Sequence, residues 1–193
     1  MQIGRELQGS YYRSDYDDPL NGETVLKAEH LNLADQLVDF SFELHAGEIL
    51  GIGGLSHCGM HTLGKVLFAA EKVESGVLTV RGEQVGSVAE AMKKQIGYVA
   101  KDRDIESLTL QASIRDNIAI AGLDQFSIAN FLLLPSKEKK YVQEQIDRLS
   151  IKCAGASQYV SALSGGNKQK VVLARWIGKG SDILVLDSPT RGI

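Results

Sequence analysis

The feature that most constrains the fold is a helix followed directly by a buried strand near the end of the chain. Residues 165–180 carry an apolar stripe at helical spacing, and Gly178 and Gly180 mark where that helix stops. The run 182–187, DILVLD, is short and apolar at its centre, as expected of a strand covered on both faces. This order predicts an α/β core built on parallel strands.

Earlier segments add a second kind of sheet. Residues 24–33 and 37–47 alternate apolar and polar side chains, which predicts half-buried antiparallel strands. The apolar run 48–54, EILGIGG, is expected to be a central parallel strand. The other expected elements are a helix at 61–71, a hairpin arm at 75–85, a short helix at 89–95, a strand at 96–102 and a mainly helical stretch from 104 to about 162.

These elements divide the chain into a tail and one domain. Residues 1–23 are polar and carry turn signals, so we expect a linker or tail there, followed by an α/β domain at 24–193. The domain should contain a small antiparallel sheet and an inserted helical subdomain at about 104–168. Because the strong strand lies six residues from Ile193, we expect a fragment of a longer polypeptide, incomplete at the C-terminus.

Composition excludes several classes of function. The net charge is −3 and the basic residues are scattered, which argues against a nucleic-acid partner. No apolar run approaches the length of a membrane span, and the N-terminus lacks the apolar core of a secretion signal. Cys58 and Cys153 are expected to be reduced thiols of a cytosolic protein.

The most specific motif is LSGGNKQK at 163–170, at the start of the predicted helix. A helix N-terminus presents free backbone N–H groups and a partial positive charge. Gly165 and Gly166 allow that backbone to approach a polyphosphate closely, and Ser164 adds a hydroxyl donor. The alternative is an ordinary serine-capped helix after a glycine turn.

Asp187 ends the predicted buried strand. A carboxylate at the C-terminal end of a parallel strand faces the crevice where ligands bind in open α/β sheets. It suits Mg²⁺, directly or through water. The alternative is an aspartate that caps the following turn.

Together these motifs resemble the ATP-binding-cassette ATPases. LSGGN resembles the signature of that family, ILVLD its Walker B strand, and SPTRGI the segment leading into its D-loop. The finer resemblance, from residue 4 onward, is to the second of the two cassettes in bacterial importers of ribose, galactose and xylose type. It implies a P-loop NTPase core of RecA-like fold, ATP and Mg²⁺ as ligands, and a place at the cytoplasmic face of the cell membrane. The implied partners are the first cassette of the same polypeptide, transmembrane permease subunits and, indirectly, a periplasmic or extracellular sugar-binding protein.

Under this resemblance the stretch 51–66, GIGGLSHCGMHTLGKV, should hold the phosphate loop G-x-x-x-x-G-K-[ST]. A register starting at Gly59 supplies Lys65 but begins five residues past the expected strand and places Val66 at the hydroxyl position. We therefore favour the register that starts at Gly54. The nucleotide-binding positions of this degenerate Walker A loop are then Gly54, Ser56, Cys58, Gly59, Met60, His61 and Thr62.

The catalytic positions implied by the resemblance are also altered. Met60 replaces the lysine that contacts phosphate, and His61 replaces the hydroxyl that binds Mg²⁺, although Thr62 is adjacent. Ser188 stands where the family has its catalytic glutamate, and Lys101 where it has the Q-loop glutamine. We therefore expect this chain alone to hydrolyse ATP very slowly or not at all.

The intact signature implies a role in trans. In this family two cassettes face head to tail, so Ser164, Gly165, Gly166 and Asn167 would complete the ATP site of the partner cassette. The chain would then be the ATP-binding domain of a sugar importer that couples ATP binding and hydrolysis to transport. The alternative is a non-catalytic nucleotide-binding or dimerisation module with no ATPase role of its own.

Weaker signals have alternative interpretations. His57, Cys58 and His61 form a conceivable metal cluster, against ordinary surface residues. Trp176 is expected in the core, and Arg103 contacts either a phosphate or a solvated ion-pair partner. The apolar segment 126–136 is either a contact patch or a buried helix.

Overall fold

The computed structural model describes residues 22–55, 57–128 and 132–190. Its first part is an antiparallel sheet of four strands in the order β2-β1-β3-β4. The strands are β1 (Thr24–Leu33), β2 (Leu37–His45), β3 (Ser75–Val80) and β4 (Glu83–Gln84). Both alternating segments and the hairpin arm are therefore confirmed. Residues 1–21 of the tail predicted at 1–23, the loop residue Ser56 and the last three residues lie outside the described parts of the chain.

The second sheet is parallel and contains β5 (Ile96–Val99) and β8 (Ile183–Leu186). Ile96 pairs with Ile183 and Val99 with Leu186, so the two strands run in register along their whole length. Ile96, Val99 and Ile183 are buried. The buried strand predicted at 182–187 and the strand predicted within 96–102 are both confirmed.

The prediction of a strand at 48–54 is wrong. These residues carry no strand assignment, and the side chains of Ile49, Leu50 and Ile52 are 83%, 40% and 40% exposed. A strand needs a hydrogen-bonded neighbour, and among the described residues the parallel sheet consists of β5 and β8. An apolar sequence alone supplies no such partner.

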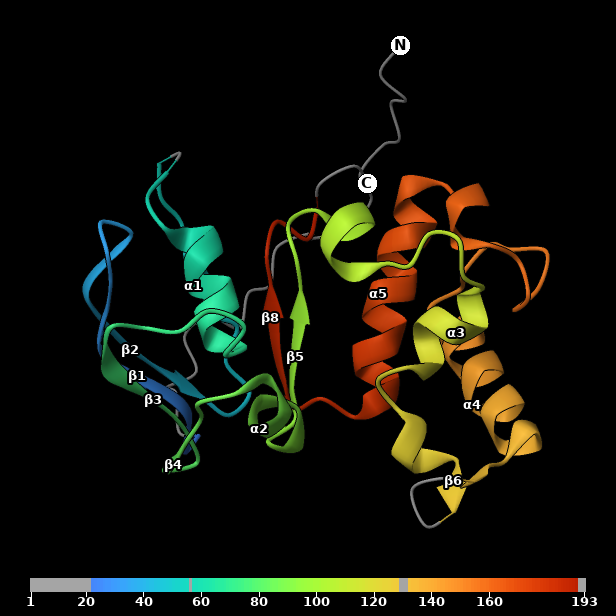
Figure 1. The fold of residues 1–193 in the computed structure, drawn as a ribbon, viewed down its shortest axis with the longest axis horizontal. Coiled ribbons are helices and arrows are strands. Elements are labelled where there is room, and N and C mark those ends of the chain that lie inside the picture. The colour runs from blue at the N-terminus through green and yellow to red at the C-terminus, as the bar shows by residue number, and fades with distance from the viewer. Residues whose placement is uncertain (1–21, 56, 129–131, 191–193) are drawn as a thin grey trace, which may run out of the picture.

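The described residues contain five α-helices, which are arranged around the parallel sheet. They are α1 (Met60–Leu67), α2 (Val88–Lys93), α3 (Ile114–Ala119), α4 (Pro135–Arg148) and α5 (Gly165–Lys179). In Figure 1, α1 lies on one side of β5 and β8, whereas α5, α3 and α4 lie on the other. The helix predicted at 165–180 is confirmed, and Gly180 ends it in the left-handed conformation (φ 81°).

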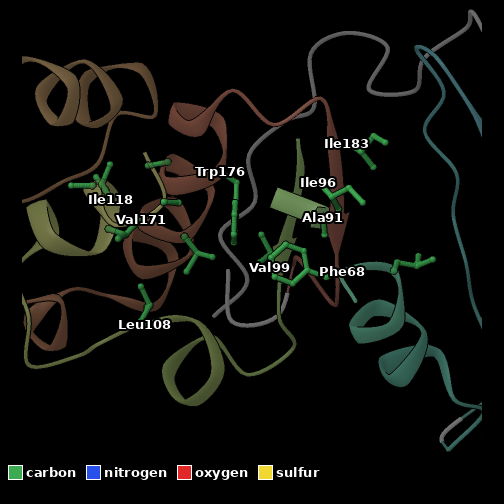
Figure 2. Close-up of a cluster of buried hydrophobic side chains, with 14 of the residues drawn as sticks. Phe68, Ala91, Ile96, Val99, Leu108, Ile118, Val171, Trp176 and Ile183 are labelled. Carbon is green, nitrogen blue, oxygen red and sulfur yellow. The ribbon is translucent and has the colours of Figure 1, made fainter. Parts of the chain in front are cut away.

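One hydrophobic cluster joins the two sides. Figure 2 shows Trp176 of α5, Val99 of β5 and Phe68, which follows α1, among its buried side chains. The Trp176 ring meets the Phe68 ring edge to face at a centroid distance of 5.4 Å. The expectation that Trp176 belongs to the core is confirmed.

The segment 126–136 does not form the buried helix that was one of its two interpretations. It forms a small antiparallel hairpin of β6 (Ser127–Ile128) and β7 (Leu132–Leu133) before α4 begins at Pro135. The buried-helix interpretation is therefore wrong, because both short strands pair with each other. Ile128, Leu132 and Leu133 are 52%, 52% and 45% exposed, so apolar side chains do face outward here. Residues 129–131 lie outside the described parts.

Candidate functional site

The candidate site lies at one edge of the parallel sheet. The carboxyl ends of β5 and β8 and the first turns of α1 and α5 all lie at the same end of the molecule in Figure 1. In open α/β sheets this edge is where ligands bind, because backbone donors and the residues that follow the strands converge there.

Asp187 follows β8 and is held by α1. His61 Nδ1 lies 2.8 Å from one carboxylate oxygen of Asp187 and 2.9 Å from the other. Ser188 Oγ donates a further hydrogen bond of 3.0 Å to Asp187 Oδ1. The Asp187 side chain is only 7% exposed, whereas that of His61 is 34% exposed. The carboxylate is therefore enclosed by the residues that the sequence placed at the metal and catalytic positions.

Lys101 completes the cluster from the other strand. It follows β5 by two residues, and its Nζ lies 2.7 Å from His61 Nε2. The three side chains Lys101, His61 and Asp187 thus form a continuous chain of hydrogen bonds. We call it the Lys–His–Asp chain.

The loop before α1 has the backbone of a tight turn. Gly59, the residue before α1, has φ 82°, and His57 has φ 68°. A positive φ is unusual for a residue with a Cβ atom, although His is one of the types enriched there. Cys58 folds back over Gly54, since a Cβ atom on Gly54 would lie 2.4 Å from Cys58 Sγ.

The structure places the candidate phosphate and metal residues in different surroundings. Met60 and His61 are the first two residues of α1. Thr62 Oγ1 donates to the side chain of Gln36 rather than to Asp187. Lys65 lies in the last turn of α1, where its Nζ donates to Glu106 at 2.9 Å. This ion pair raises the pKa of Lys65 above its ordinary value.

The signature residues lie at the N-terminus of α5. Ser164 is the N-cap and is exposed, but its side chain does not bond to the helix backbone. Its Oγ accepts instead from Asn167 Nδ2 at 3.0 Å, while Asn167 Oδ1 accepts from the Lys152 N–H at 2.9 Å. A Cβ atom on Gly166 would meet nothing within 4 Å. The first turn of α5 is thus firmly held yet open on its outer side.

The segment 101–107 joins the two parts of the site. Lys101 contacts His61, and Glu106 contacts Lys65, both on α1. The same segment binds α5 through three contacts: Arg103 to Gln169 at 3.2 Å, Asp104 to Lys168 at 2.8 Å, and the Ser107 carbonyl to Arg175 at 2.6 Å. Residues 103–107 form a π-helical turn, an irregularity common at functional sites.

The residue weighed for phosphate contact, Arg103, lies beside Asp104 with a Nε to Oδ1 distance of 3.8 Å. The conceivable His57–Cys58–His61 metal cluster is wrong, since the described residues contain no group of three or more His, Cys, Asp or Glu arranged to hold a metal. Cys58 and Cys153 are both free thiols.

Magnesium fits poorly at Asp187 in this arrangement. Mg²⁺ needs near-octahedral oxygen ligands at about 2.0–2.1 Å. Both carboxylate oxygens of Asp187 already contact His61 Nδ1, and the nearest α1 hydroxyl, that of Thr62, is directed toward Gln36. The residues present therefore do not form a magnesium site while these contacts are made.

Sequence reasoning named His61 but missed its contact with Asp187, because the two positions are 126 residues apart in the chain. It did not identify Gln36 and Glu106, which hold Thr62 and Lys65. No local pattern indicates contacts between such distant positions.

The fold and the residues at this edge define an ATP-binding cassette. The chain belongs to the ABC transporter family, and the sequence model of that family matches residues 37–191. The cassette fold is shared with a dimeric ATP-binding cassette solved in a post-hydrolysis state with ADP and Pi, at a TM-score of 0.72 over 87% of this chain and 75% of that one, with 18% identity. It is also shared with cbiO1 from Clostridium perfringens, part of the ABC transporter complex cbiONQ (TM-score 0.68, 25% identity, 88% of this chain and 67% of that one).

Among curated relatives, the chain is 36% identical to the ribose import ATP-binding protein RbsA of Bacillus subtilis, over 99% of this chain and 38% of that protein. It is 37% identical to a putative ribose/galactose/methyl galactoside import ATP-binding protein of Halalkalibacterium halodurans, over 100% of this chain and 37% of that protein. The chain therefore spans less than two fifths of the length of these relatives. Within the described residues, every helix is too short or too polar to cross a membrane.

Proposed function

We propose that the chain is a cassette of a bacterial sugar importer and serves a second ATP site through its signature rather than hydrolysing ATP at its own loop. The relatives named for ribose and galactose import support the sugar-importer assignment. Their greater length is consistent with a second cassette carried on the same polypeptide.

The observation that carries the proposal is the state of Asp187. In an active site this carboxylate would have to be available for Mg²⁺, but here it accepts from His61 and from Ser188. Ser188 cannot take up a proton at neutral pH, so it cannot act as the general base. Loss of a general base costs about 10²–10⁴ in rate.

The loop itself supports the same conclusion. Met60 at the start of α1 offers no charge to a phosphate, and Lys65 lies at the far end of that helix with Glu106 as its partner. This placement supports the register that begins at Gly54, in which the degenerate Walker A positions run from Gly54 to Thr62. Weak or absent binding of ATP with Mg²⁺ follows for this half.

The first turn of α5 is the part suited to a polyphosphate. Ser164 is exposed, Gly166 has open space beside its Cα, and the free N–H groups of the turn carry the positive end of the helix dipole. In the importer these groups would complete the ATP site of the first cassette, which supplies its own lysine, Mg²⁺ ligand and glutamate.

The membrane partners would bind elsewhere. Permease subunits are the expected partners at the cytoplasmic face of the membrane, with the sugar-binding protein acting through them. A run of exposed apolar side chains supports a contact there, comprising Ile120, Leu123, Ile128, Leu132 and Leu133. The strand β6, which carries Ile128, lies at the opposite end of the molecule from the carboxyl ends of β5 and β8 in Figure 1.

The test is ATP hydrolysis by the complete importer polypeptide. Ser164→Arg, which fills the open first turn of α5, should abolish turnover. The matched control is Ser161→Arg, which adds the same bulk and charge at an exposed serine outside the glycine pair. Ser188→Ala in this half should leave turnover unchanged. Full turnover after Ser164→Arg would refute the proposed role of the signature in the partner's ATP site, and a large loss after Ser188→Ala would give this half a hydrolytic role.

A calorimetric titration of ATP and Mg²⁺ into the chain distinguishes the proposed function from the alternative of a nucleotide-binding or dimerisation module. Absent or millimolar binding is expected here. Micromolar binding together with full turnover of Ser164→Arg would favour a nucleotide-holding or dimerisation module with no part in ATP hydrolysis.

A further inference from the structure

The Lys–His–Asp chain has a defined direction. A lysine ammonium only donates hydrogen bonds, so His61 Nε2 must accept from Lys101 across the 2.7 Å contact. The proton of a neutral imidazole then resides on Nδ1, which donates to the Asp187 carboxylate at 2.8 Å. The positive charge of Lys101 is thereby connected to the negative charge of Asp187 through a neutral ring.

We infer that Lys101 and His61 together replace the divalent cation at Asp187, so that this half of the ATPase is closed to Mg²⁺ by its own side chains. The inference rests on the proposed function for the role of Asp187 as the metal-bearing aspartate of the family. It goes further by naming the side chains that occupy the metal's position. It also predicts that substituting those side chains restores metal binding.

Three features make the replacement effective. Only 7% of the Asp187 side chain is exposed, and charge interactions are stronger where water is excluded. A metal ion would have to displace His61 from both carboxylate oxygens. It would also have the same sign of charge as the Lys101 ammonium, which contacts the other nitrogen of that ring, and like charges repel.

The arrangement also explains why His61 and Lys101 occur together. His61 alone would leave Nε2 without the donor it has here, and Lys101 alone would lie one side chain away from the carboxylate. The pair comes from two different parts of the fold, the first turn of α1 and the segment that follows β5. Removing either residue should therefore weaken the block, and removing both should lift it.

The experiment measures binding of Mn²⁺ alone to the full chain by electron paramagnetic resonance of the free ion. Mn²⁺ shares the preference of Mg²⁺ for octahedral oxygen ligands. We expect the unmodified chain to bind Mn²⁺ no more tightly than about the millimolar range. His61→Ser/Lys101→Gln, which supplies a hydroxyl and removes the cation, should bind roughly tenfold more tightly or better. Adding Asp187→Asn should remove that gain.

The matched control is His57→Ser/Lys72→Gln. It makes the same two chemical changes at an exposed histidine of the loop and an exposed lysine beyond α1. This variant should bind Mn²⁺ as the unmodified chain does. Circular dichroism establishes that each variant is folded, and Lys101→Gln alone serves if the double variant unfolds, with a smaller gain expected.

Two results overturn the inference. One is tight Mn²⁺ binding by the unmodified chain that Asp187→Asn abolishes. The other is a folded double variant, or a folded Lys101→Gln variant, whose Mn²⁺ affinity is unchanged. Neither result depends on Ser164 or on turnover by a partner cassette, so the proposed role of the signature is tested separately.

Discussion

Gly97 of β5 lies directly against Trp176 of α5, and a Cβ atom on Gly97 would lie 2.9 Å from both Cβ and Cγ of the tryptophan. The same atom would lie 3.0 Å from Leu184 Cδ2 on the neighbouring strand. The absence of a side chain at Gly97 therefore sets how closely the signature helix packs on the parallel sheet. That distance in turn fixes α5 relative to the residues that follow β5 and β8.

Gly97→Ala should destabilise the fold by about 1–3 kcal/mol, since overpacking a closed contact forces the helix or strand to shift. Urea denaturation of the folded chain measures the change. Gly86→Ala is the control, because its Cβ would make only an ordinary 3.7 Å contact with Glu90. Equal stability of the two variants would mean that α5 moves freely on the sheet.

Gly59→Ala should cost more than Gly47→Ala, although both glycines have a φ near 80°. At Gly47 a Cβ atom would meet nothing within 4 Å, so only the left-handed conformation is penalised, at about 1–2 kcal/mol. At Gly59 the atom would lie 2.0 Å from the Gln36 carbonyl oxygen. The difference in unfolding free energy between the two variants isolates this contact, and a difference near zero would contradict it.

Arg175→Met should loosen the segment 101–107 from α5. The buried guanidinium donates to the carbonyls of Asn117 and Ser107, at 2.7 and 2.6 Å, and burial lowers the pKa of Arg175 to about 10. It remains charged at neutral pH. Leaving these acceptors without a donor should cost roughly 1.5–3 kcal/mol.

Hydrogen exchange of the 103–107 amides should be faster in Arg175→Met than in the unmodified chain. Arg115→Met is the control, because that side chain is 53% exposed. Comparable exchange and stability in the two variants would show that Arg175 does not hold the segment.

Acid should weaken α3 through its capping box. Ser113 and Asp116 bond reciprocally at the start of that helix, and the hydrogen bond from Ser113 lowers the pKa of Asp116 below its ordinary 3.8. A carboxylate with a lowered folded-state pKa stabilises the fold above the unfolded value. That contribution is lost as the pH falls through the folded value.

Asp116→Asn should therefore reduce stability at pH 7. It should make little difference at pH values below the folded-state pKa of Asp116. The measurement is the midpoint of thermal unfolding at several pH values for both proteins. Ser113→Ala should cost about 1 kcal/mol at neutral pH, as expected for loss of an N-cap. A constant difference between Asp116→Asn and the unmodified chain at every pH would contradict this account.

Elements with a strong internal pattern were predictable from the sequence. The alternation of apolar and polar side chains in β1 and β2 and the apolar stripe of α5 depend on which face of each element is buried. Residues close together in the sequence show that pattern directly. The segment 48–54 was mispredicted because its apolar run says nothing about which strand, if any, lies beside it. At 126–136 the sequence left the choice open, and local pairing of β6 with β7 decided it.

The candidate site divides in the same way. The glycine pair at the start of α5 and the acidic end of β8 are contiguous motifs, so their place at one edge of the sheet could be anticipated from the expected order of elements. The contact of His61 with Asp187 could not, because it joins positions 126 residues apart and depends on how α1 sits against β8. Lys101 was notable from sequence only as a substitution, whereas the structure gives it a partner.

The burial of Trp176 has a practical consequence for optical measurements. The sequence contains a single tryptophan, and its ring lies against Phe68 at the junction of α5, β5 and the end of α1. Intrinsic fluorescence excited at the indole band therefore reports on this junction and on no other part of the molecule. Any movement of α5 relative to α1 would alter the tryptophan emission without an attached dye. Changes confined to the antiparallel sheet would leave that emission unchanged.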